Sequence, residues 1–228
     1  VLVLYFANIV LVVPLAKKLL MSNQEAETLA SEVKKEFGGQ DAFVDALAEN
    51  VTCTARSTTI SCGEASVSTV EHVLSALTGM GVDNAYIEID NVEVPILDGS
   101  AKPYIDAMWA DGFQQQDAPR HYIEIKETIE IRNDEKGSVV RIEPAEEFSY
   151  DIMVDFNSRV LGVQHAVWNP SVVYAEEIGV CRTFVFFHEI EFLFKNGLVK
   201  GGDVDNAIVI VEHPVTTEQV ENMSRLFN

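Results

Sequence analysis

The sequence predicts an α+β protein that consists of two units in tandem, and three observations carry this prediction. The chain has 228 residues, of which 47% are hydrophobic, enough to build packed cores. Predicted strands and helices occur in groups, without the regular strand-helix alternation that is typical of a parallel sheet. The stretch DGFQQQDAPR at 111–120 is polar, contains Gly and Pro, and lacks periodicity, so we expect a linker at 114–120.

Residues 1–40 are unlike the rest of the chain. The run VLVLYFANIVLVVPLAKKLL at 1–20 is almost continuously apolar, and about 20 such residues are enough to cross a bilayer core. Three interpretations stay open: a membrane segment that would give a membrane contact, a buried strand-turn-helix element, or a stretch from a misjoined reading frame. A capping box at Ser22 and Glu25 then predicts a solvated helix that ends before Gly38. We expect residues 1–20 to contribute nothing to the folded core.

The first folded unit is expected at residues 41–113. It should open with strands over 42–60, where Val, Thr and Ala recur with a period of two. A helix should follow from a capping box formed by Ser68 and Glu71, because apolar residues recur behind it at helical spacing. These apolar residues are Val70, Val73, Leu74 and Leu77. The remaining elements should be a strand at 85–90, a turn at 95–100 and a helix at 102–110.

The second unit is expected at residues 121–228. Alternating apolar and charged residues predict strands at 121–131, 138–143 and 150–156, of which the first two are joined by the turn residues NDEKG. A short helix should start near Pro170, another should run from Glu189 to Lys195, and AIVIV at 207–211 should be a buried strand.

Composition excludes one class of function and indicates a compartment. The formal net charge is -20 with only 16 basic residues, whereas a nucleic-acid binder needs clustered Lys and Arg to neutralise phosphates. We therefore expect no nucleic-acid partner. The cysteines Cys53, Cys62 and Cys181 form no CxxC pair, and an odd number at wide spacing predicts reduced, buried thiols in a cytosolic protein.

The adjacent residues Glu71 and His72 are the first candidates for chemistry. A neutral imidazole is a good zinc ligand, and a neighbouring carboxylate can take a proton from water. Consecutive helical residues point about 100° apart, so one side chain can hold a metal while the other faces a water molecule. The capping box gives Glu71 a purely structural role as well, so the dipeptide alone leaves both interpretations open.

The stretch CRTFVFFHEIEFLF at 181–194 is a second candidate. His188 and Glu189 superficially match a zincin, but that motif needs a second His at the fifth position, where Phe192 stands. We therefore expect only an exposed helix start there. The residues 98–100, DGS, predict a tight turn before a helix, which favours anions but is also ordinary punctuation. Three further histidines have no partner at ligand spacing: His121, His165 and His213.

Four strings in one order carry a family resemblance: VSTVEHVLSALTGMGVDNAYIEID at 67–90, VPILDGSAKPYI at 94–105, RTFVFFHEIEFL at 182–193 and NGLVKGGDVDNAIVI at 196–210. Together they resemble the bacterial UDP-3-O-acyl-N-acetylglucosamine deacetylase family, the zinc amidases that commit cells to lipid A synthesis. The resemblance runs from about residue 42 to the end of the chain. The tail after the AIVIV string resembles the family variant that is fused to a hydroxyacyl carrier-protein dehydratase.

The resemblance implies two α+β sandwich domains with the active site between them. It implies that His72 is a zinc ligand, that Glu71 is the general base, and that the Thr183 hydroxyl stabilises the oxyanion. The implied reaction is zinc-dependent hydrolysis of the 2-acetamido group of UDP-3-O-acyl-N-acetylglucosamine in the bacterial cytoplasm, with release of acetate. The positions implied to line the substrate site and the passage for the acyl chain are Phe184, Ile190, Gly201 and Gly202.

The sequence also departs from the family pattern. The family's other zinc ligands stand in an H-K-x-x-D string, which is followed by a later catalytic His. This sequence shows no counterpart of either. His213 cannot substitute, because Thr217 stands four positions after it in place of the Asp. The family's opening G-x-H-[ST]-G turn is not found in residues 1–40. We therefore expect both domains to be incomplete, and we expect the 228-residue chain to bind zinc weakly and to have negligible deacetylase activity. Two alternatives stay open: a catalytically silent module that binds nucleotide sugars or acyl chains, and a membrane-tethered interaction protein.

Overall fold

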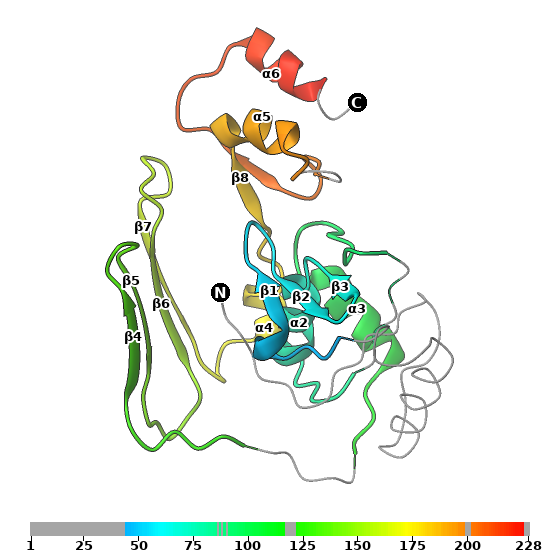
Figure 1. Cartoon of the computed structure of the whole chain (residues 1–228), viewed down its shortest axis with the longest axis vertical. Helices are drawn as coiled ribbons and strands as arrows, with labels where there is room; N and C mark the ends of the chain where they lie inside the picture. The colour runs from blue at the N-terminus through cyan, green and yellow to red at the C-terminus, as the bar shows by residue number, and fades with distance from the viewer. Residues whose placement is uncertain are drawn as a thin grey trace. The chain divides into compact units, whose positions relative to one another are not determined.

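The computed structural model describes residues 44–85, 87, 89, 91–116, 122–198 and 202–225 (Figure 1). The chain forms two compact units. Unit 1 comprises Val1–Asp117 and Tyr174–Asn228, and unit 2 comprises Ala118–Val173. Helices occur together with several small, mostly antiparallel sheets, which confirms the predicted α+β class. The division into domains at 41–113 and 121–228 stays a prediction.

Unit 1 opens with a three-stranded antiparallel sheet in the order β1-β2-β3. Ile60 on β2 is only 2% exposed, whereas its neighbour Ser61 points to the other face and bonds to hydroxyls on both adjacent strands. This alternation is the period of two that predicted strands before Ile60. The elements are the short 3-10 helix η2 (Ala48–Asn50), β1 (Val51–Cys53), β2 (Thr59–Cys62) and β3 (Ala65–Val67).

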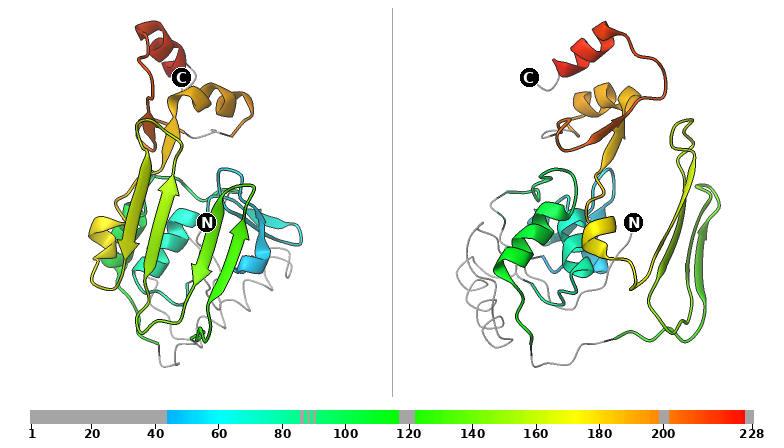
Figure 2. Two further views of the ribbon diagram at one scale, coloured as in Figure 1. Left: turned by 90° about the vertical axis from the view of Figure 1, so that its left-hand side faces the viewer. Right: turned by 180° about the vertical axis from the view of Figure 1, so that it is seen from behind.

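Among the described elements of unit 1, three helices pack residues into two buried clusters (Figures 1 and 2). Helix α2 (Glu71–Gly79) buries Val73 and Leu77 in the cluster that contains Ile60. Its Ala76 lies in a second buried cluster together with residues of α3 (Lys102–Asp111) and α4 (Tyr174–Glu177). The predicted apolar stripe of α2 is thus confirmed. The strand predicted at 85–90 falls on a stretch that is only partly described, where Ile87 packs in the first cluster.

The capping box predicted for Ser68 and Glu71 is wrong. The residue before the helix is Val70, and no side chain caps α2. Thr69 adopts a left-handed backbone (φ 60°), so the chain turns between the two members of the expected box. The carboxylate of Glu71 instead accepts a hydrogen bond of 2.9 Å from the backbone amide of Thr58. A tertiary contact has replaced the local one, and it fixes the Glu71 side chain at the start of the helix.

A strand-helix-strand segment follows α4 in unit 1. Strand β8 (Phe184–Phe186) pairs in parallel with β9 (Ile208–Ile210), and α5 (Phe187–Lys195) connects them. Because Ile190 and Leu193 are three residues apart, they share one helix face, and both are buried. The helix predicted from Glu189 to Lys195 and a strand within 207–211 are confirmed, but the predicted burial of that strand is wrong, because Ile208 is exposed and Val209 and Ile210 are only half-buried. A further helix, α6 (Thr217–Ser224), begins with a capping box between Thr216 and Gln219 that the sequence analysis missed.

Unit 2 contains two antiparallel hairpins, drawn in green to yellow-green in Figure 2. Strand β4 (Ile129–Asn133) pairs with β5 (Ser138–Ile142), and β6 (Tyr150–Asp155) pairs with β7 (Val163–Trp168). Three strands were predicted, and β7 was missed. The strand expected at 121–131 is shorter than predicted, because pairing with β5 begins only at Ile129.

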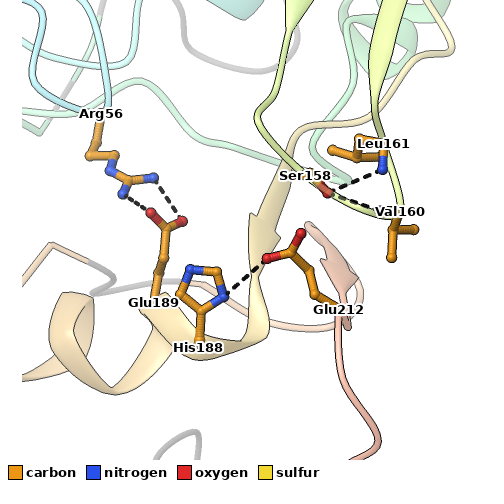
Figure 3. A network of polar contacts seen from close by, with 7 residues as sticks. All are labelled: Arg56, Ser158, Val160, Leu161, His188, Glu189 and Glu212. Atoms are coloured by element: carbon orange, nitrogen blue, oxygen red, sulfur yellow. Dashed lines mark hydrogen bonds and ion pairs between the residues drawn. The ribbon is translucent and has the colours of Figure 1, made fainter.

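The loop between β6 and β7 is closed by one side chain. The hydroxyl of Ser158 accepts hydrogen bonds from the backbone amides of Val160 and Leu161, at 3.2 and 3.1 Å (Figure 3). Ser158 is buried, so these bonds satisfy a polar group that is shielded from water. The Ser158 side chain therefore acts together with the backbone bond from the Gly162 amide to the Ser158 carbonyl in fixing this loop.

Two predictions about the environment of the chain can be compared with the described residues. All three cysteines are free and exposed, so the expectation of buried thiols is wrong. Cys53 and Cys62 are the last residues of their strands, where a side chain gains little cover from the sheet. Within the described ranges no helix is both long and apolar enough to cross a membrane. The segment at 1–20, for which a membrane contact was considered, lies outside those ranges.

Candidate functional site

The first turn of α2 carries Glu71 and His72. The Thr58 amide holds the Glu71 carboxylate, and His72 is the next residue of the helix. Burial lowers the pKa of His72 below its usual value of 6.5, although the negative charges of Glu71 and Asp98 act in the opposite direction. The imidazole is therefore neutral near pH 7, which is the form that binds a metal ion. Both residues lie where the sequence predicted them, at the start of one helix.

The turn before α3 contains the carboxylate that acts on His72. The hydroxyl and the backbone amide of Ser100 donate to one oxygen of Asp98, at 2.7 and 3.0 Å. Ser100 is 1% exposed, and its hydroxyl also accepts a hydrogen bond from the amide of Lys102. Burial opposes ionisation of Asp98, but the Ser100 hydrogen bonds and the charge of Arg182 outweigh it and lower the pKa of Asp98. The turn therefore presents a fixed negative charge.

Thr183 lies against the same turn. Its backbone amide donates to the carbonyl of Gly99 at 2.8 Å, and its carbonyl accepts from the amide of Ile208 at 2.9 Å. Thr183 thus connects the turn to β9. Thr183 thus bonds directly to the turn, and the charge of Asp98 in the same turn raises the pKa of His72 on α2. His72 and Thr183 are far apart in sequence, and both interact with this turn.

The four positions implied to line a substrate passage have different environments. Phe184 is the first residue of β8 and is 38% exposed, with its ring edge-to-face against Phe186. Ile190 is only 1% exposed and belongs to the interior beneath α5. Gly202 is half-buried, and Gly201 lies outside the described residues. Phe184 is therefore the large apolar side chain of this set that a ligand can contact directly.

Two arginines that the sequence analysis passed over tie this region together. Arg56 pairs with Glu189 at the start of α5, with nitrogen to oxygen distances of 2.6 and 3.3 Å (Figure 3). Arg182 donates to the backbone carbonyls of Asp98 and Asp205. The sequence gives no signal for either contact. Arg56 is 133 positions from Glu189, and Arg182 is 84 positions from Asp98. The partners of Arg182 are also backbone carbonyls, which every residue has.

The helix start at His188 and Glu189 is confirmed, but only His188 is exposed as expected. The His188 side chain is 63% exposed and lies 3.7 Å from Glu212. Glu189 is 25% exposed because Arg56 covers it. His165 and His213 lie on the surface as expected, and His121 is outside the described residues.

The described residues supply one side chain with the properties of a catalytic metal ligand. His72 is neutral, half-buried and adjacent to a fixed carboxylate, a combination that fits a zinc ligand with a general base beside it. In the described ranges, no group of three or more His, Cys, Asp and Glu side chains is placed to hold a metal ion.

Comparisons with known proteins identify the family of this chain. The sequence profile of the family described as UDP-3-O-acyl N-acetylglycosamine deacetylase matches residues 27–224. The bifunctional enzyme LpxC/FabZ of Porphyromonas gingivalis is 42% identical over 181 residues, which cover 79% of this chain and 39% of the relative. The UDP-3-O-acyl-N-acetylglucosamine deacetylase of Helicobacter hepaticus is 44% identical over 173 residues, 75% of this chain and 57% of the relative.

A third relative shows the same extent of similarity. The UDP-3-O-acyl-N-acetylglucosamine deacetylase of Teredinibacter turnerae is 40% identical over 178 residues, 77% of this chain and 58% of the relative. The chain thus spans between 39% and 58% of the length of these relatives. With the profile match covering most of its residues, the chain belongs to the UDP-3-O-acyl-N-acetylglucosamine deacetylase family.

Proposed function

We propose that this chain carries part of the active site of a zinc-dependent deacetylase that hydrolyses the N-acetyl group of UDP-3-O-acyl-N-acetylglucosamine. One observation carries the proposal: the neutral His72, next to the fixed carboxylate of Glu71, shares the Asp98–Ser100 turn with Thr183. Metal-dependent amide hydrolysis needs a general base, a metal ligand and a hydroxyl donor close to one another. The names of the relatives supply the substrate.

The proposal gives separate roles to Glu71, Thr183 and Asp98. Glu71, held by the Thr58 amide, takes the proton of the attacking water as a general base and passes it to the leaving amine. Thr183, held by the Gly99 carbonyl, places its hydroxyl to donate to the oxygen of the acetyl group as negative charge develops there. Asp98 stays ionised and supports the orientation of His72 through its charge.

His72 would hold the metal ion as one of its protein ligands. A bound zinc ion supplies Lewis-acid chemistry, which brings the pKa of water to about 7. A catalytic zinc site takes about three protein ligands, and His72 is the one that this chain matches to the family set. We further propose that the others come from an H-K-x-x-D string, and that domains at 41–113 and 121–228 border the site.

The substrate contacts that we propose lie on the β8-α5-β9 segment. Phe184 offers an exposed aromatic surface to the acyl or sugar portion of the substrate. Gly201 and Gly202 would let a lipid chain pass close to the backbone. Ile190 is buried on the inner face of α5, and we propose that it lines the acyl passage from there.

The test is acetate release from UDP-3-O-acyl-N-acetylglucosamine, measured together with zinc content. We would compare the 228-residue polypeptide with one extended by a segment that carries the H-K-x-x-D string and the later His. Glu71→Gln should abolish acetate release and retain zinc, whereas His72→Gln should lose both. The matched controls are Glu64→Gln and His213→Gln, which change exposed residues of the same types and should retain both.

The outcomes separate this proposal from its main alternative. Zinc binding and substrate binding without acetate release from either polypeptide would indicate a silent binding module. Acetate release that survives Glu71→Gln would show that another group is the base. Stoichiometric zinc in the 228-residue polypeptide would mean that ligands other than the proposed string complete the site.

A further inference from the structure

Arg182 connects three backbone segments of unit 1. Its Nε donates to the carbonyl of Asp98 at 2.8 Å. Its Nη2 donates to the carbonyls of Asp205 and Val204, at 2.5 and 3.3 Å. The side chain therefore binds the turn before α3 on one side and the loop before β9 on the other, from the position next to Thr183.

The backbone bonds of Thr183 run between the same two segments. Its amide donates to Gly99 and its carbonyl accepts from Ile208. Gly99 has a left-handed backbone (φ 81°), and a Cβ atom there would lie 1.9 Å from the carbonyl oxygen of Asn206, so the turn and the loop touch directly. Three short stretches of chain thus meet around residues 182 and 183, without a continuous sheet to hold them.

Hydrogen bonds from a guanidinium are the strong ones in this junction. A donor that carries charge makes bonds roughly twice as strong as neutral pairs, and the planar fork of Arg can reach two carbonyls in fixed directions. Because Nε and Nη2 donate to backbone carbonyls, we assign Arg182 a role in holding the backbone and not in binding the substrate. Its loss would leave Thr183 held by its two backbone bonds alone.

We propose that Arg182 is a positioning residue, which sets the place of Thr183 relative to the Asp98–Ser100 turn by clamping the carbonyls of Asp98, Val204 and Asp205. This inference deepens the proposed deacetylase function, since Thr183 is the hydroxyl donor of that site. Arg182 itself touches no reacting atom in this assignment. Its effect on chemistry passes through Thr183.

The clamp is tested first without any substrate, by amide hydrogen exchange in the 228-residue polypeptide. Arg182→Met keeps the apolar stem and removes every donor. We expect exchange of the Thr183 and Ile208 amides to rise by about 10-fold to 100-fold, as for loss of a hydrogen bond to a charged group. Arg182→Lys should give a smaller rise, because an ammonium group cannot serve both sides. The control Arg132→Met removes an exposed arginine of unit 2 and should leave both amides unchanged.

Two results would overturn the clamp. The first is unchanged exchange of the Thr183 and Ile208 amides in Arg182→Met. The second is that Arg182→Lys loses protection throughout β2 and α2 in addition to these two amides, which would indicate general unfolding. The second readout uses whichever polypeptide releases acetate. There Arg182→Lys should lower kcat with KM within about twofold, the split expected when a group acts in the transition state. An equal rise in KM would show that Arg182 binds substrate instead. If neither polypeptide releases acetate, the proposed function fails, and the exchange result still decides the clamp.

Discussion

The guanidinium of Arg56 binds the carboxylate of Glu189 through two hydrogen bonds, and this pair joins the β1-β2 loop to the first turn of α5. Arg56 has a left-handed backbone (φ 67°), which a non-glycine residue adopts only at some cost. The Arg56 side chain is 49% exposed and that of Glu189 is 25% exposed. The exposure of the pair is therefore intermediate between that of a surface ion pair, which contributes little to stability, and that of a buried ion pair. The pair attaches the start of α5, whereas Arg182 binds the loop before β9 through the carbonyls of Val204 and Asp205.

We expect a measurable but small coupling between these two residues. Arg56→Ala, Glu189→Ala and the double variant form a cycle of unfolding free energies, and the coupling should be about 0.2–1 kcal/mol at pH 7. The exchanged pair Arg56→Glu with Glu189→Arg should recover part of it. Denaturant unfolding measures all four. Zero coupling at low salt would show that the pair does not hold α5.

The pair should also have a defined pH dependence. The hydrogen bond and charge of Arg56 lower the pKa of Glu189 below its usual value of 4.5, against a smaller opposing effect of burial. The unfolded state then binds the proton more readily, so the stabilisation is complete above pH 4.5 and is lost as the pH falls through the folded-state pKa. The coupling measured at pH 7 should therefore decrease as the pH falls below 4.5. In Glu189→Gln this acid-dependent component should be absent.

Gly99 should tolerate no side chain. Gly99→Ala places a Cβ atom 1.9 Å from the Asn206 carbonyl oxygen at a positive φ, so both the backbone strain and the clash act against folding. We expect a loss of about 2–4 kcal/mol in unfolding free energy. Gly81→Ala is the matched control, since Gly81 has φ 72° and open space around it, and it should cost only about 1 kcal/mol. Equal losses in the two variants would mean that the Asn206 contact is not tight.

The sequence was sufficient where local patterns decide structure. The apolar spacing of Val73 and Leu77 predicted α2, and the alternation around Ile60 predicted its sheet. Local reasoning failed at Ser68, because a backbone reversal at Thr69 and the distant Thr58 amide determine what Glu71 binds.

The candidate site divides in the same way. Glu71, His72 and Thr183 were found through short strings that resemble a family. Arg182 and Arg56 were not, because their partners are backbone carbonyls and a carboxylate far along the chain. No periodicity or motif encodes such contacts, which depend on how the elements pack.

Tyr174 should anchor α4 to α2. Its hydroxyl lies 2.5 Å from the Ser75 hydroxyl, and its ring occupies the space beside Gly79, where a Cβ atom would lie 2.1 Å from it. Tyr174→Phe removes one hydrogen bond and should cost about 0.5–1.5 kcal/mol. Ser75→Ala should cost a similar amount, and the double variant little more than either one. Fully additive losses in denaturant unfolding would show that the two hydroxyls do not bond to each other.

The protonation of His72 gives the most direct test of the candidate site. Burial lowers the pKa of His72 below 6.5, while Glu71 and then Asp98 raise it by their charge. Proton NMR of the metal-free protein should therefore show His72 titrating below 6.5. Glu71→Gln and Asp98→Asn should each lower the pKa of His72 further, with the larger effect in Glu71→Gln.

The same shift sets a stability dependence with a known sign. The folded state binds the His72 proton less readily than the unfolded state. The contribution of neutral His72 to the free energy of unfolding is therefore fully present above pH 6.5 and is lost as the pH falls below 6.5 through the folded-state pKa. His72→Gln should remove this component, and His213→Gln, at an exposed residue, should leave it in place. A pKa of His72 at or above 6.5 would mean that burial does not outweigh the charges of Glu71 and Asp98. The imidazole would then be partly charged near neutral pH, and the assignment of His72 as a metal ligand would lose its electrostatic basis.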